Sequence, residues 1–172
     1  MATIRNKGDL IAILRAVVTR LRAQLNSGTR PVNESNCYLC LDPNAKKKTA
    51  SDLVFVVGPS SGSFDEAMIE GGGQEQLTAD LYLIVTIQSA LQLDEAQREE
   101  YFLTDAGLGV LGAGTDVLAA LAVWDPSTTS GADTLLQVRD PLMPSGFEFS
   151  KEGKSKGSMT LTFKCKFDWD VS

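Results

Sequence analysis

The chain contains no histidine, so three kinds of site lose their usual residue. Histidine is the most frequent general base, the commonest metal ligand and the ordinary pH-sensitive side chain. Catalysis by Asp, Glu, Lys or Cys remains possible, but an enzyme becomes less expected. Long hydrophobic runs are also missing, since none approaches the roughly 20 residues of a membrane-spanning helix. No small-residue cleavage site follows residues 10–14, so we expect no secretory signal and a cytosolic place of synthesis.

Cysteine is scarce, with three residues in the chain, which does not suggest a disulfide framework. Cys37 and Cys40 have the C-x-x-C spacing, but a zinc site would need a second pair and only Cys165 is left. The pair lies in strand-like sequence, where the two side chains would point to opposite faces. We therefore expect free structural thiols. An enzyme that uses Cys37 or Cys40 stays open as an alternative.

Length and composition predict one globular domain over residues 1–172. Hydrophobic residues make up 43% and charged residues 22% of the chain, as in ordinary globular proteins. Apolar residues recur at helical spacing in three stretches and alternate, or form short runs, in five others. The expected helices cover 9–25, a stretch that begins at Asp94, and 115–124. The expected strands cover 37–41, 53–57, 77–88, 134–149 and 158–171.

The closing stretch 158–171 has the clearest pattern in the chain. Its apolar members alternate with threonine, lysine and aspartate, which predicts a strand with one buried face. The expected buried residues are Met159, Leu161, Phe163, Cys165, Phe167 and Trp169. The order of helices and strands predicts an α+β fold, with a mostly antiparallel sheet flanked by the N-terminal helix and a central helical pair.

Two polar segments and two prolines mark the irregular parts of this fold. We expect long loops at 42–52 and 58–76, the second rich in glycine and serine. Pro141 and Pro144 interrupt the strand at 134–149 and predict an edge strand or a bulge. Residues 148–159 predict a hairpin with a basic tip.

Two glycine motifs suggest nucleotide binding but lack the context that it requires. The run GLGVLG at 107–112 has dinucleotide-binding spacing, yet helix-like sequence precedes it where a strand is needed. We expect its glycines to end one helix and start the next. The run EGKSKG at 152–157 contains Gly-Lys-Ser, but Glu148 stands where a phosphate loop needs glycine, and a strand follows. We expect no cofactor and no metal.

Charge is unevenly distributed along the chain. Residues 1–48 carry a net +6, residues 49–148 a net −14 and residues 149–172 a net +2. This distribution is either ordinary solvated surface or a self-complementary pattern by which copies dock head to tail. In the second case the basic contacts would be Arg15, Arg20, Arg22, Lys46, Lys47, Lys48, Lys154 and Lys156. The acidic contacts would be Asp65, Glu66, Glu70, Glu75, Asp94, Glu95 and Glu99.

The order of elements resembles the tail terminator proteins of long-tailed bacteriophages. The resemblance runs through LIAILRAVVTRLRAQL, the glycine-rich segment before LYLIVTIQ, LDEAQREEYFLTDAGLGVL with VLAALAVW, LLQVRDPLMPSGFEF and MTLTFKCKFDWDV. It covers most of the chain and is one of pattern and order. It implies a non-catalytic virion protein that forms a ring, usually a hexamer, at the head-proximal end of the tail. The ring would stop polymerisation of the tail tube and face the head connector.

Partners follow from the same resemblance. They would be copies of the chain itself, the tail tube protein and a head-completion or connector protein, with assembly in the host cytoplasm. DNA would pass through the lumen without specific binding, and no membrane would be involved. Another head–tail joining protein, such as a tail completion or neck protein, remains an alternative. So does a small-ligand or regulatory binding domain with glycines 71–73 in a lid.

Overall fold

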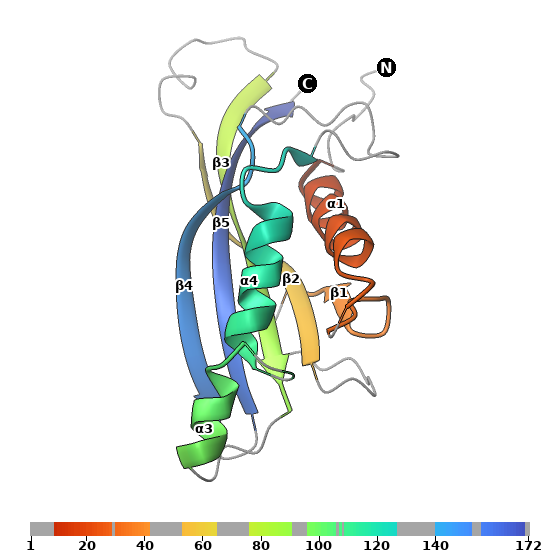
Figure 1. Ribbon diagram of the computed structural model, residues 1–172. Coiled ribbons are helices and arrows are strands. Elements are labelled where there is room, and N and C mark those ends of the chain that lie inside the picture. Colours follow the sequence, from red (N-terminus) through yellow and green to blue (C-terminus); the bar gives the residue numbers. More distant parts are fainter. Residues whose placement is uncertain are drawn as a thin grey trace.

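A computed structural model shows an α+β fold in which one twisted sheet carries helices on one face (Figure 1). It describes residues 9–28, 30–41, 53–64, 76–90, 96–105, 107, 109–126, 140–152 and 156–170. The described helices are α1 (Asp9–Gln24), α3 (Ala96–Phe102) and α4 (Val110–Leu121). The described strands are β1 (Cys37–Leu39), β2 (Leu53–Phe64), β3 (Gln76–Ser89), β4 (Met143–Glu152) and β5 (Lys156–Asp170).

The sheet has the strand order β1-β2-β3-β5-β4, and every pairing is antiparallel except that of β1 with β2. The predicted fold class is therefore confirmed. The two longest strands, β3 and β5, pair from Gln76↔Asp170 to Ser89↔Gly157 and form the middle of the sheet. Strand β3 contains the stretch 77–88 that the sequence predicts as a strand, and it has neighbours on both sides.

The alternating residues of β5 bury one face, as the sequence predicts. Phe163 is fully buried and lies opposite Leu83, while Thr162 and Lys164 on the other face are half-buried. Met159, Leu161, Cys165 and Phe167 are buried as well. The side chain of Trp169 lies outside the described residues. Burial of this stripe removes apolar area from water and so stabilises the central pair of strands.

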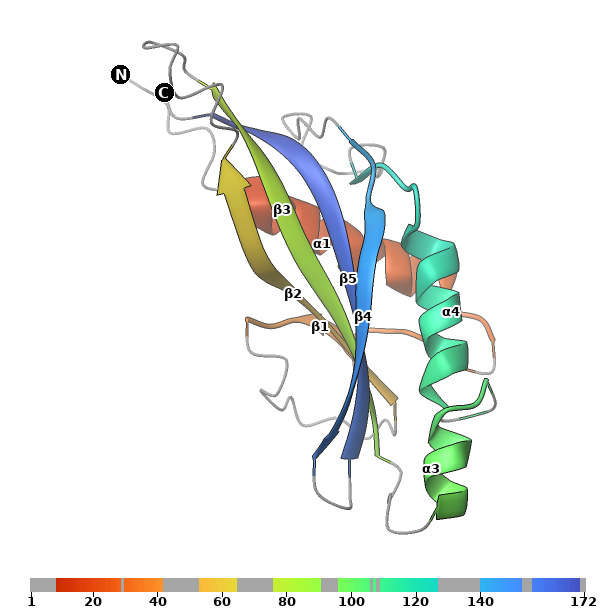
Figure 2. The same cartoon turned by 90° about the vertical axis from the view of Figure 1, so that its left-hand side faces the viewer.

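The helices cover the buried face of the sheet. Helix α1 packs on β1 and β2 with Ile13, Val17 and Leu21, which are fully buried, and α4 packs on β3 and β5 beside it. The apolar spacing that predicts α1 over 9–25 thus locates its buried stripe correctly. In Figure 2, α1 lies behind the strands and α4 to the right of them, with α3 at the end where β4 meets β5.

The glycines of GLGVLG end one helical segment and start the next, as expected. Gly107 has φ +49°, a left-handed conformation that glycine adopts without strain. Gly109 is the N-cap of α4. Gly112 lies so close to the preceding turn that a Cβ atom would be 2.4 Å from the Asp105 carbonyl oxygen. These glycines therefore serve backbone packing, and the dinucleotide interpretation is not needed to explain them.

Several predicted boundaries are wrong. The strand expected at 134–149 begins only at Met143 and runs to Glu152, and residues 140–142 are not part of it. The loop expected at 58–76 is partly strand, because β2 continues to Phe64 and β3 begins at Gln76. Residues 59–64 are small, polar or exposed, so they lack the apolar pattern of a strand, but pairing with β3 through a bulge at Pro59/Ser61 holds them extended. Helix α4 starts at Val110 and not at Thr115, since tertiary packing overrides the low helix propensity of its glycines. The strand expected at 37–41 ends at Leu39.

Some of the other predicted segments lie outside the residues that the structure describes, and some lie within them. Residues 42–52, the core of the glycine-rich segment at 65–75, and the start of the predicted helix at Asp94 lie outside them. Strand β4 lies at the edge of the sheet and has a register shift between Pro144 and Gly146. Both features match the edge or bulge that the prolines predict. The hairpin of β4 with β5 is also confirmed, whereas residues 153–155 at its tip are not described.

Candidate functional site

The thiols are buried or half-buried and free, as the sequence predicts. Burial raises the pKa of Cys37 to about 11 and that of Cys165 to about 12, so both remain neutral thiols at neutral pH. The third thiol, Cys40, is half-buried just after β1. Across the described ranges, Cys, Asp and Glu form no group of three that could hold a metal ion. No helix within those ranges is long and apolar enough to cross a membrane.

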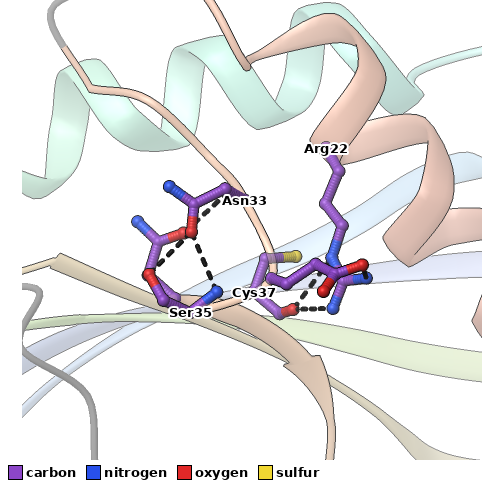
Figure 3. Close-up of polar contacts among 6 residues, drawn as sticks. Arg22, Asn33, Ser35 and Cys37 are labelled. Atoms are coloured by element: carbon purple, nitrogen blue, oxygen red, sulfur yellow. Dashed lines mark hydrogen bonds and ion pairs between the residues drawn. The ribbon is translucent and has the colours of Figure 1, made fainter.

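Arg22 fastens α1 to the first strand. Its guanidinium donates from Nε at 3.1 Å and from Nη2 at 2.5 Å to the carbonyl oxygen of Cys37 (Figure 3). Glu34 lies 3.8 Å from the same guanidinium. In the turn before β1, the Asn33 side-chain oxygen accepts hydrogen bonds from the backbone and the hydroxyl of Ser35 (Figure 3). Arg22, which the charge pattern predicts only as a contact between copies, therefore has a structural role inside the subunit.

Arg20 also makes contacts within the chain. Its Nε donates to the carbonyl oxygen of Ala120 at 3.2 Å, and the guanidinium lies 5.5 Å from the centre of the Trp124 ring. The hydrogen bond satisfies one of the carbonyls at the C-terminal end of α4, and the positive charge suits that end of the helix dipole. Arg20 thus joins α1 to α4.

Arg30 holds the junction between α3 and α4, and no local sequence pattern marks it as important. Its Nη2 lies 3.0 Å from the Asp116 carboxylate, and its Nη1 donates at 2.6 Å to the Asp105 carbonyl oxygen. Gly112 leaves room for this guanidinium, because a Cβ there would come within 2.7 Å of Nη2. Only tertiary structure brings these residues together, since they are separated by 75 to 86 positions in the chain.

Two ion pairs involve the last two strands. Lys151 of β4 pairs with Glu99 of α3, which ties the helix to the end of the edge strand. Lys164 of β5 lies 3.0 Å from the Asp80 carboxylate and 5.7 Å from the centre of the Tyr82 ring. The hydrogen bond to Asp80 raises the pKa of Lys164. Lys151 and Lys164 are not among the predicted contacts.

The residues predicted to make contacts between copies fall into three groups: exposed, partnered within the subunit, or outside the described residues. Arg15 is exposed on α1, while Arg20, Arg22 and Glu99 have partners inside the subunit. Lys156 begins β5, but its side chain lies outside the described residues. Their role in contacts between copies stays a prediction. The remaining members also lie outside the described residues: Lys46, Lys47, Lys48, Asp65, Glu66, Glu70, Glu75, Asp94, Glu95 and Lys154.

One edge of the sheet carries exposed aromatic side chains. Residues 143–151 of β4 are all exposed. Phe147 is 70% exposed and Phe149 is 40% exposed, and their rings meet edge to face with centres 5.9 Å apart. They pair with Leu161 and Met159 of β5, so they lie on the helix-bearing face of the sheet. Helix α4 packs on β3 and β5, which leaves this pair of rings uncovered by it.

A hollow of about 280 Å³ lies near the opposite edge, beside the last residues of β2. Its apolar lining includes Leu10 of α1, Leu81 of β3 and Phe167 of β5. Gly62 of β2 pairs with Leu81 and has no side chain to fill the space above it. The volume is just below the ~300–1,000 Å³ of typical small-molecule sites. The hollow is therefore apolar and large enough to accept one apolar side chain.

Comparison with solved structures relates this fold to a virus-like particle. The chain is similar to a subunit in the virion of a native gene transfer agent particle, with 14% identity and a TM-score of 0.58. The match covers 96% of this chain and 99% of that subunit. No protein-family model matches the sequence, and no curated protein matches it either. The similarity establishes a shared fold over nearly the whole length of both chains.

Proposed function

We propose that the protein is a structural component of a phage-like virion. The observation that carries this proposal is the fold shared along almost the full length with a subunit of the gene transfer agent virion. The match extends over nearly all of both chains, so the likeness is not confined to one motif. Among the described residues, the polar contacts of Arg20, Arg22 and Arg30 join helices and strands. This use of charged side chains suits a scaffold whose function lies in its surfaces.

Within that class, we propose a tail terminator. The protein would form a ring, six copies in the family it resembles, cap the tail tube and present a different face to the head connector. The exposed edge strand and the segregated charges support repeated contacts between copies. The gene transfer agent subunit belongs to a whole particle, so the same fold match also supports another head–tail joining protein.

Electron microscopy of particles assembled with and without the protein tests this function. Without a terminator, tails should be overlong or should fail to join heads, and supplying the wild-type protein should restore both. Tails of normal length that lie unattached beside filled heads would instead indicate a head–tail joining protein. Normal joined particles in its absence would contradict a role in the virion.

A further inference from the structure

The sheet has two edges that no described strand covers. One is the outer side of β4, and the other is β2 beyond Val57, because β1 pairs only with Phe55–Val57. Each edge presents backbone N–H and C=O groups that can pair with another strand. Such edges usually carry charge, proline or bulges that discourage pairing. Both have a proline and a bulge, yet β4 also exposes Phe147 and Phe149.

The two edges have complementary shapes on the same face of the sheet. Phe147 pairs with Leu161, and Gly62 pairs with Leu81; both leucines are buried under the helices. The projecting ring of Phe147 and the hollow beside Gly62 therefore lie in the helix layer, at opposite edges.

The strand directions also allow the two edges to pair with each other in neighbouring copies. Strands β2 and β3, β3 and β5, and β5 and β4 are each antiparallel, so β2 and β4 run in opposite directions. A second copy placed beside the first, with its helices on the same side, would bring its β2 antiparallel to the first copy's β4. The same contact would place the helix layers side by side and allow Phe147 to reach the hollow.

Charge supports the same arrangement. Helix α1 covers the β2 side and exposes Arg15. The turn and helix on the β4 side expose Glu100 and Asp105, with Glu99 joined to Lys151 at the end of β4. Copies arranged in this way would bring the side that exposes Arg15 toward the side of the next copy that exposes Glu100 and Asp105, which favours their encounter in that orientation.

We propose that β4 of one copy adds to residues 59–64 of β2 of a second copy, with Phe147 seated in the hollow at Gly62. This inference rests on the proposed ring and names the surface that builds it. The contact joins two different patches, so it is heterologous and generates a closed ring when the rotation between copies closes. Pairing of β4 with β4 would instead produce a two-fold dimer.

Native mass spectrometry and sedimentation of the full chain, over a range of concentrations, test the surface. The wild-type protein should form a closed ring. Phe147→Asp should raise the apparent dissociation constant by more than about tenfold, because it places a charge in an apolar contact. Ser150→Asp is the matched control: it adds the same charge to the same strand on the opposite face and should leave the ring intact. At concentrations too low for the ring to form, both variants should melt like the wild type, since both positions are exposed.

Cross-linking locates the contact. In a Cys40→Ser background, a short bismaleimide should join a Phe147→Cys copy to a Phe64→Cys copy, while a Ser150→Cys copy should not react with Phe64→Cys. Rings that persist in Phe147→Asp, or a cross-link that joins two Phe147→Cys copies in place of the Phe147→Cys and Phe64→Cys pair, would overturn this surface. Rings that persist in Phe147→Asp would leave the proposed terminator function intact. A wild-type chain that stays monomeric on tail tubes would overturn both the proposed surface and the proposed function.

Discussion

Strands β5 and β4 are neighbours in one sheet, yet their side chains have opposite environments. On β5, Phe163 is fully buried between β3 and the helices. On β4, one strand away, Phe147 is 70% exposed. Both are phenylalanines on the helix-bearing face, so the difference comes from the width of the helix layer, which extends over β5 but not over β4. The middle of the sheet therefore provides stability, and its edge is available for assembly.

The largest expected effect is the loss of a ring from the middle of the sheet. Phe163→Ala should lower the free energy of unfolding by about 3–5 kcal/mol, because it leaves a cavity in a packed core. Phe147→Ala should change it by less than about 0.5 kcal/mol, as at other exposed positions. Denaturant titrations of both variants measure the difference. Equal losses would show that the helix layer covers both strands.

A smaller loss is expected where the helical pair packs against its own turn. Gly112→Ala should lower the free energy of unfolding by about 1–3 kcal/mol, because the added methyl group must displace the Asp105 backbone. The control is Gly146→Ala on the edge strand, where a Cβ atom meets nothing within 4 Å. Thermal melts that rank Gly146→Ala as the more harmful change would contradict the packing described for α4.

The thiols should make stability depend on pH above about 9. Burial raises the folded-state pKa of Cys165 to about 12, above its ordinary value of 9.0. Between these values the unfolded state binds fewer protons than the folded state. Each such thiol therefore lowers the free energy of unfolding by about 1.4 kcal/mol per pH unit. In Cys165→Ala the decline between pH 9 and 11 should be less steep; an unchanged slope in urea titrations would show that the thiol is accessible to water.

Ionic strength should separate subunit stability from assembly. Raising salt shortens the screening length from about 8 Å near physiological strength to about 3 Å at 1 M. Contacts between exposed charges such as Arg15 and Glu100 should then weaken, while the buried core should keep its melting temperature. Sedimentation and melting at two salt concentrations compare the two effects. Oligomers that are indifferent to salt would indicate an interface dominated by apolar groups such as Phe147.

The sequence predicts the middle of this fold better than its edges. Strand β5 and helix α1 have strong periodic burial, so their residues determine their structure locally. The extension of β2 to Phe64 depends on pairing with β3, and the contacts of Arg30 join residues far apart in the chain. Neither the extension of β2 nor the contacts of Arg30 can be read from neighbouring residues in the sequence. Alternation in β4 predicts that Phe147 lies on one face of the sheet. No sequence pattern shows that the helices leave this part of the face uncovered.

If the protein ends a polymer, as we propose, it should control the length of tail tubes. Purified protein would be added to tail tube subunits during polymerisation, and the tubes measured by electron microscopy. A terminator should bind tube ends as a ring and shift the length distribution toward short tubes as its concentration rises. An unchanged length distribution, with tube ends left bare at every concentration, would show that the protein is not a terminator.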